Sequence, residues 1–113
     1  MCEYTLAHVG INCECEEEAI KSAKMLEALF GLTVKVGNSS VFAGTAVECN
    51  KKPGRGKHGH IAIATPDIKA AVADLESRGF TFNPDSAVIK NGNLKAIYIS
   101  DEICGFAVHL VQP

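Results

Sequence analysis

The chain contains 113 residues, of which 47% are hydrophobic and 21% charged, and its formal net charge is −2. A chain of this size and composition is typical of one domain with a buried core. The small net charge does not indicate a nucleic-acid partner, and no apolar run reaches the roughly 20 residues that a membrane-spanning helix requires, so we expect neither nucleic acid nor membrane as a partner.

The first half of the chain predicts a strand, a helix and three further strands. Residues 4–12 favour a strand, and the acidic run Glu16–Glu18 favours the start of a helix, where negative charge suits the helix dipole. Apolar residues recur at helical spacing up to Phe30, and Gly31 is the residue type that ends a helix in the left-handed conformation. Short β-rich runs follow at Thr33–Val36, Ser40–Ala43 and Thr45–Cys49.

The second half of the chain predicts the same order of elements. His58–Thr65 favours a strand, Thr65-Pro66-Asp67 is a helix-start signal, and Gly79 is expected to close the helix. Asn91-Gly92 predicts a hairpin turn. The β-rich runs of this half are Thr81–Phe82, Ala87–Lys90, Leu94–Ser100 and Phe106–Val111.

A short phrase occurs in both halves, each time before a helix of the same pattern. His8-Val9-Gly10-Ile11 precedes the first helix, and His60-Ile61-Ala62-Ile63 precedes the second. Two copies of a strand-then-helix unit predict a duplicated α+β fold with pseudo-twofold symmetry. We therefore expect a single domain over residues 1–113, made of two βαβββ modules that span about residues 1–53 and 56–113.

Four residues of metal-binding type lie at corresponding places in the two halves. His8 and His60 begin the repeated phrases, while Glu48 and His109 end the matching segments Ala46-Val47-Glu48 and Ala107-Val108-His109. Three imidazoles and one carboxylate suit Zn, Ni, Co, Fe(II) or Mn(II), and they leave room for water or substrate. The set therefore predicts one divalent metal site between the modules.

The same four residues also have a simpler interpretation, in which each is a satisfied polar residue of the core. Their occurrence as two pairs at symmetry-related positions favours the metal site. His58 lies on the same strand face as His60. It is an alternative ligand, or else a residue of the pocket rim or the surface.

Five cysteines occur in the chain, and the N-terminus lacks the basic and apolar segments of a secretion signal. An odd number of cysteines without such a signal indicates reduced thiols, and we expect a cytoplasmic protein. Cys13 and Cys15 would point away from the strand face that carries His8, and Cys49 faces opposite to Glu48. We interpret the cysteines as packing residues.

The segment Lys51-Lys52-Pro53-Gly54-Arg55-Gly56-Lys57 joins the two halves and carries four cations in seven residues. One interpretation is a solvated connector between the repeats. The other is a guide for an anionic substrate.

Several phrases resemble the vicinal oxygen chelate superfamily, also called the glyoxalase/bleomycin-resistance/dioxygenase family, over nearly the whole chain. These phrases are His8-Val9-Gly10-Ile11, Leu29-Phe30-Gly31-Leu32, Val47-Glu48, Gly59-His60-Ile61-Ala62-Ile63 and Gly105-Phe106-Ala107-Val108-His109-Leu110. The resemblance implies two βαβββ modules that curl into a cup-shaped mixed sheet with a divalent metal inside. His8, Glu48 and His60 match the ligand types of the family.

His109 departs from the family pattern, because glyoxalase I enzymes usually carry a glutamate there that is often taken as the catalytic base. Glu48 is then the only carboxylate of the set and the candidate catalytic proton carrier. The resemblance implies a lyase or isomerase that acts on a small 2-oxo or 2-hydroxycarbonyl compound through a metal-chelated enediolate. It also implies a homodimer, with the modules paired within a chain or between chains.

Other functions are open on the same resemblance. Relatives of the bleomycin-resistance type bind a small molecule without turning it over. Val36–Gly44 and Gly105–Val111 resemble a glyoxalase-like domain that follows a 2-dehydro-3-deoxyphosphogluconate/4-hydroxy-2-oxoglutarate aldolase in some anaerobic bacteria, which implies an accessory role beside such an aldolase. Oxygen-dependent ring cleavage is a weaker alternative, because those relatives usually use two histidines and one glutamate on Fe(II). The expected cup-lining residues Asn12, Phe42 and Tyr98 do not identify a substrate.

Overall fold

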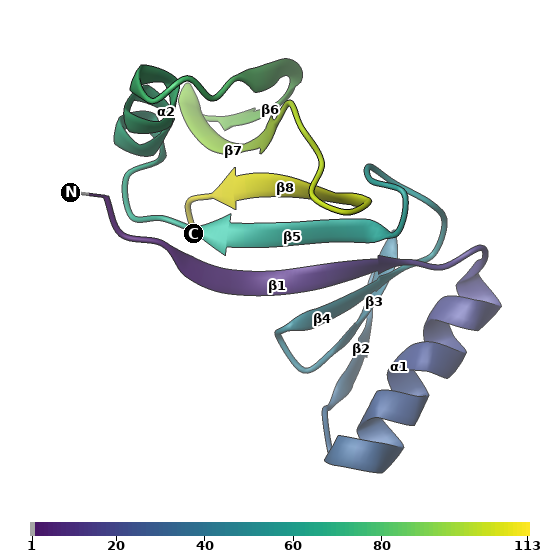
Figure 1. The fold of residues 1–113 in the computed structure, drawn as a ribbon. Helices are drawn as coiled ribbons and strands as arrows, with labels where there is room; N and C mark the ends of the chain where they lie inside the picture. The colour runs from purple at the N-terminus through teal and green to yellow at the C-terminus, as the bar shows by residue number, and fades with distance from the viewer. Residues whose placement is uncertain (1) are drawn as a thin grey trace.

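The computed structural model describes residues 2–113, and Figure 1 shows its fold. The first half consists of β1 (Thr5–Asn12), α1 (Glu16–Phe30), β2 (Val34–Val36), β3 (Ser40–Ala43) and β4 (Val47–Asn50). The second half consists of β5 (Gly59–Ala64), α2 (Ile68–Ser77), β6 (Phe82–Lys90), β7 (Asn93–Ile99) and β8 (Phe106–Val111). The βαβββ order predicted for both halves is confirmed.

All eight strands form one mixed sheet in the order β2-β3-β4-β1-β5-β8-β7-β6. At its centre β1 and β5 are antiparallel neighbours, and each runs parallel to the last strand of its own half, β4 or β8. In Figure 1 the short strands β2, β3 and β4 run at a steep angle to β1, β5 and β8. The predicted α+β class is confirmed, and the two halves pair within the chain.

Helix α1 begins and ends as its sequence predicts. The acids of Glu16–Glu18 occupy its first turn, and Gly31 follows its last residue with a φ of 73° and donates its N–H to the carbonyl of Glu27. The buried face of the helix packs in a core formed by Cys13, Ala19, Ala23, Val41, Ala43 and Cys49. Because Cys49 faces this core, its neighbour Glu48 faces the opposite side of the sheet.

Helix α2 is capped by Asp67, whose carboxylate accepts a hydrogen bond from the N–H of Ala70 at 3.1 Å. Its buried residues Ile68 and Ala71 pack against β7 and β8. Gly79 has a φ of 94° just beyond the helix end, as its sequence position predicts. Within residues 2–113, neither helix combines the length and the apolar character needed to cross a bilayer.

The two β-rich runs predicted before the Asn91-Gly92 turn are parts of one strand, β6. Its pairing with β7 is regular up to Asn83 and resumes at Val88. Pro84 lies in the gap and has no N–H to donate. Ser86 compensates in part, because its hydroxyl accepts a hydrogen bond from a backbone N–H of β7 at 2.8 Å. The sequence pattern therefore detected the break in pairing but not the continuity of the strand.

The cysteines differ in their surroundings. Cys13 and Cys49 are 2% and 0% exposed in the core beneath α1, so their predicted packing role is confirmed. Cys15 and Cys104 are exposed, and the packing interpretation is wrong for these two. Cys15 lies at the N-terminal cap of α1, and Cys104 lies in the turn before β8. Both stand where the chain turns at the surface, which residue type alone does not reveal.

Candidate metal centre

The four predicted donors lie in two neighbouring rows of paired residues across the centre of the sheet. The first row crosses β4, β1 and β5 and consists of Glu48, Gly10 and His60. The second row crosses β1, β5 and β8 and consists of His8, Ala62 and His109. Each row therefore has a donor on either side of a residue with little or no side chain.

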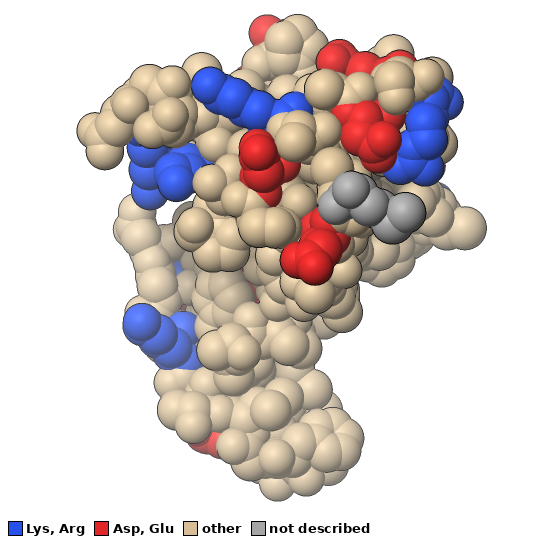
Figure 2. All heavy atoms as spheres, turned by 90° about the vertical axis from the view of Figure 1, so that its left-hand side faces the viewer, with Lys and Arg blue, Asp and Glu red and all other residues tan. Residues whose placement is uncertain are grey.

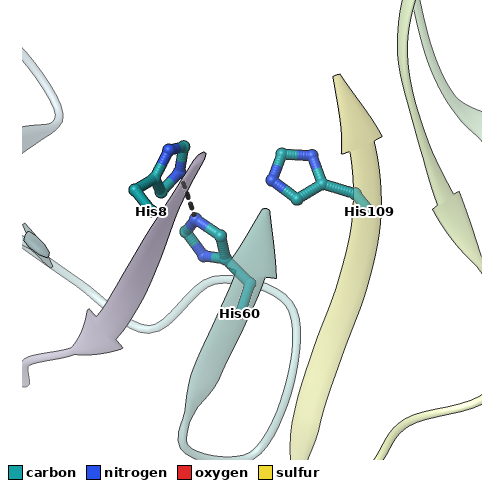
Figure 3. Close-up of side chains that lie close together, drawn as sticks. All are labelled: His8, His60 and His109. Atoms are coloured by element: carbon teal, nitrogen blue, oxygen red, sulfur yellow. Dashed lines mark hydrogen bonds between the residues drawn. The ribbon is translucent and has the colours of Figure 1, made fainter. Parts of the chain in front are cut away.

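The donor atoms converge on one space. The Nε2 atoms of His8 and His60 are 3.1 Å apart, and Oε1 of Glu48 lies 3.4 Å from the first and 3.1 Å from the second. One ring nitrogen from each of His8, His60 and His109 lies within 4.8 Å of the others. Figure 3 shows the three rings pointing toward one another from β1, β5 and β8. The structure thus brings His8 and His60 close to Glu48 on one side and to His109 on the other.

Gly10 makes room for the imidazole of His60. A Cβ atom added to Gly10 would overlap the His60 ring, so the ring occupies the space of the absent side chain. The backbone of Gly10 is outside the left-handed region, and the need for glycine is therefore one of space. In the other half the corresponding position is Ala62, which pairs with His8 and carries only a methyl group.

The separations between the donor atoms fit a shared cation. Ligand atoms at about 2.1 Å from one ion are about 3.0 Å apart at right angles and about 3.4 Å apart at tetrahedral angles. The three distances among His8, His60 and Glu48 fall at these values. Imidazole nitrogen with carboxylate oxygen is also a donor set that divalent transition metals prefer. The residues present therefore fit a divalent metal ion.

The surroundings of His109 are a second, independent observation in favour of a bound cation. Its side chain is 9% exposed, and neither ring nitrogen has a hydrogen-bond partner among residues 2–113. Leaving a buried polar atom unpaired costs about 1–3 kcal/mol, which a bound cation would offset at one nitrogen. Burial, with smaller effects of His60 and His8, lowers the pKa of His109 to about 4, so the ring is neutral at pH 7 and free to act as a ligand.

Tyr98 and Ser40 hold two of the donors in position. The Tyr98 ring stacks on the ring of His109, with centroids 4.4 Å apart and planes 9° apart. The Ser40 hydroxyl donates a hydrogen bond to Oε2 of Glu48 at 2.8 Å. Hydrogen bonds from His60 and His8, with a smaller one from Ser40, hold the pKa of Glu48 well below its usual range. Glu48 is therefore ionised, which suits a metal ligand.

The donors form one wall of a pocket of about 450 Å³. The pocket is completed by Tyr98 and by residues of the segment between the halves, Lys52, Pro53, Gly54 and Arg55. His58 is exposed and packs beside Phe106, with ring centroids 5.9 Å apart, outside the pocket lining. Of the interpretations open for His58, the geometry therefore favours a surface residue.

Comparison with known proteins gives a match of fold. No model of a known protein family matches the sequence, and neither does any curated protein. Among solved structures, methylmalonyl-CoA epimerase in complex with methylmalonyl-CoA and ammonium is similar, with a TM-score of 0.62 and 18% identity over 95% of this chain and 92% of that one. The Mycobacterium tuberculosis methylmalonyl-CoA epimerase has a TM-score of 0.62 and 16% identity, over 96% of this chain and 87% of that one.

A third similar structure is the hypothetical protein BH1468 from Bacillus halodurans C-125, with a TM-score of 0.64 and 16% identity over 98% of this chain and 95% of that one. The epimerases and BH1468 are members of the vicinal oxygen chelate superfamily. The chain has the vicinal oxygen chelate fold. At these identities the similarity establishes the architecture, and the chemistry must be argued from this chain's own residues.

Within the vicinal oxygen chelate fold, Ser40 is a residue near the centre that had no role predicted from sequence. Asn12, Phe42 and Tyr98 were expected to line the cup, and of these three Tyr98 lines the pocket. Ser40 lies two positions before Phe42 on β3, and Phe42 pairs with Glu48, so strand alternation would indicate the shared face once the register was known. Tyr98 pairs directly with His109, which again requires the register. Asn12 binds the segment between the halves instead of lining the pocket.

Proposed function

We propose that this protein binds a divalent cation (Zn, Ni, Co, Mn or Fe) through His8, Glu48, His60 and His109, and acts as a metal-dependent lyase or isomerase on a small 2-oxo or 2-hydroxycarbonyl compound. The observation that carries the proposal is the convergence of these donors at one wall of a pocket, with a buried His109 ring that lacks any partner among residues 2–113. The similarity to methylmalonyl-CoA epimerase, an isomerase by name, supports the general kind of reaction.

A divalent cation, when bound, polarises a carbonyl and makes the proton on the neighbouring carbon more acidic. The chain's own residues would position this chemistry. Ser40 orients the carboxylate of Glu48, and Tyr98 orients the ring of His109. Glu48 is the one acid among the pocket-lining residues that the structure describes, and we assign it the proton transfer.

A second candidate function is a domain that binds a small molecule through the cation without turning it over, either alone or as an accessory to a sugar-acid aldolase. The observation in its favour is that both carboxylate oxygens of Glu48 already contact other side chains, those of His60, His8 and Ser40. Its lowered pKa makes Glu48 a weak base at neutral pH. This candidate requires the same metal site and differs only in catalysis.

The first experiment measures the metal content of purified protein after loading with Zn²⁺ or Co²⁺ and removal of the free ion. We expect about one ion per chain in the wild type and a large loss in His60→Ala. His58→Ala is the matched control, because it removes an imidazole of the same strand region that lies outside the pocket lining. A wild type that retains no ion, or a His60→Ala variant that retains as much as His58→Ala, would refute the metal site.

The second experiment separates catalysis from binding. The metal-loaded protein is mixed with 2-oxopentanoate in D2O, and the loss of the proton signal beside the carbonyl is followed by NMR, with the free metal ion as the reference. Catalysis predicts faster exchange than the reference and a loss of about a hundredfold in Glu48→Gln. Binding that shifts the ligand signals without accelerating exchange would favour the second candidate.

We also propose that the protein forms a homodimer. Leu29 and Phe30 at the end of α1 are 64% and 69% exposed, and Leu6 on β1 is 61% exposed. On the face drawn in Figure 2, charged atoms gather over the upper part, and the lower end carries few of them. Exposed apolar side chains that form a contiguous patch favour association, and Leu29 and Phe30 are adjacent in the sequence. Light scattering should give twice the chain mass of 12.0 kDa for the wild type and the single mass for Phe30→Glu.

A further inference from the structure

The basic segment between the halves is held over the pocket by Asn12, the last residue of β1. The Asn12 side-chain oxygen accepts hydrogen bonds from the Asn50 side chain at 3.1 Å and from the N–H of Gly54 at 3.2 Å. Its side-chain nitrogen donates to the carbonyl of Gly56 at 2.9 Å. The segment is therefore attached to the strands that carry the donors, which distinguishes it from a loose connector.

The cations of this segment have different partners. Lys51 forms an ion pair with Glu16 at 2.8 Å. Lys52 and Arg55 line the pocket, and neither has an acidic partner within 4.0 Å in the part of the chain that the structure describes. The Arg55 guanidinium lies over the ring of Tyr98, with its carbon 5.2 Å from the ring centroid. Two unpaired positive groups thus face a pocket whose one described acid, Glu48, is directed at the histidines.

We propose that Lys52 and Arg55 form an anion-binding subsite, so that the ligand is a small acid with chelating oxygens at one end and a carboxylate or phosphate at the other. This inference rests on the proposed function for the chelating end of the ligand. A guanidinium stacked on an aromatic ring loses little freedom when it binds an oxyanion, because its planar fork is already oriented. The pocket of about 450 Å³ accommodates a ligand of this size.

The test uses two ligands with the same five-carbon chain, 2-oxoglutarate and 2-oxopentanoate, which differ in a distal carboxylate against a methyl group. Calorimetric titration of the metal-loaded wild type should give about tenfold tighter binding of 2-oxoglutarate. Arg55→Gln should remove most of this preference, so that the two ligands bind with similar affinity. 3-Phosphooxypyruvate, titrated in parallel, distinguishes a phosphate from a carboxylate as the better anion.

Arg78→Gln and Lys24→Gln are the matched controls for Arg55→Gln and Lys52→Gln. Arg78 is exposed in the turn after α2, Lys24 is exposed on α1, and both lie outside the pocket lining. Equal affinities of the two ligands for the wild type, or an unchanged preference in Arg55→Gln, would overturn the subsite while leaving the metal site intact. If no cation binds, NMR titration of the metal-free protein with inorganic phosphate tests whether the anion subsite exists on its own. In that case the metal site is already refuted; shifts at residues 52–56 that disappear in Arg55→Gln would support the subsite, and absent shifts would overturn the subsite as well.

Discussion

Gly10 and His60 are direct partners in the pairing of β1 with β5, and the imidazole of His60 lies where a side chain of residue 10 would be. The absence of one side chain therefore allows a donor of the second half to lean toward the donors of the first. Glu48 on β4 pairs with Gly10 from the other side, and its carboxylate oxygen lies 3.1 Å from Nε2 of His60.

Gly10→Ala should displace the His60 ring. Overpacking of this kind destabilises a protein by about 1–3 kcal/mol. Loss of ligand orientation should lower the metal affinity by about 10- to 100-fold, as measured by competition with a chelator of known affinity. Gly54→Ala is the control, because an added Cβ there meets its nearest atom only at 3.9 Å. Unchanged affinity in Gly10→Ala would mean that His60 does not bind the ion.

The metal-free protein should lose stability on acidification between pH 6.5 and 4. The pKa of His109 is about 4 in the folded state against an ordinary 6.5, so within this window the unfolded chain binds a proton that the folded chain does not. The free energy of unfolding therefore falls as the pH falls, by about 2–3 kcal/mol, and levels off below pH 4 for this group. The lowered pKa of Glu48 adds a further loss once the pH falls below the ordinary range of a carboxyl.

Urea unfolding of the chelator-treated protein at several pH values between 7 and 4 measures this dependence. His109→Gln should have a flatter profile in the upper part of that range, because the substituted amide does not titrate. A profile in the variant that is as steep as in the wild type would assign the acid sensitivity to other groups.

Tyr98→Ala should weaken metal binding, whereas Tyr98→Phe should preserve it. The stacked ring holds His109 in place, and aromatic pairs of this kind contribute about 0.5–1.5 kcal/mol. We expect the alanine variant to bind the ion several-fold more weakly, up to about tenfold. Equal losses in both variants would indicate that the hydroxyl group, and not the stacking, supports the site.

Asn12→Ala should release the basic segment from β1. Three hydrogen bonds of the Asn12 side chain would be lost, each with a net contribution of about 0.5–1.5 kcal/mol. Hydrogen exchange at the N–H of Gly54 should accelerate by at least about tenfold, because that N–H loses its acceptor. Asn38→Ala in the exposed turn before β3 is the control and should leave the exchange at Gly54 unchanged.

Much of the architecture could be predicted from the repeated phrases. The correspondence of Glu48 with His109 followed from the matching segments that end each half, and the structure places them at equivalent positions, one beside Gly10 and one beside Ala62. Helix ends were also predictable, because Gly31 and Gly79 act through local backbone geometry.

Features that depend on strand register could not be predicted. The stacking of Tyr98 on His109 requires their direct pairing between β7 and β8, and the contact of Ser40 with Glu48 requires the pairing of β3 with β4. A register shift between Leu6 and His8 also breaks the simple alternation of β1. Sequence spacing within one strand carries no information on such relations between strands.

The junction between β1 and β5 divides the donors evenly, with His8 and Glu48 from the first half and His60 and His109 from the second. An ion bound by all four donors would link the two halves, because neither half could unfold without releasing the ion. Its binding free energy would then appear as added cooperativity of unfolding. In the metal-saturated protein the two halves should unfold in a single thermal transition. In the metal-free protein they should unfold one after the other.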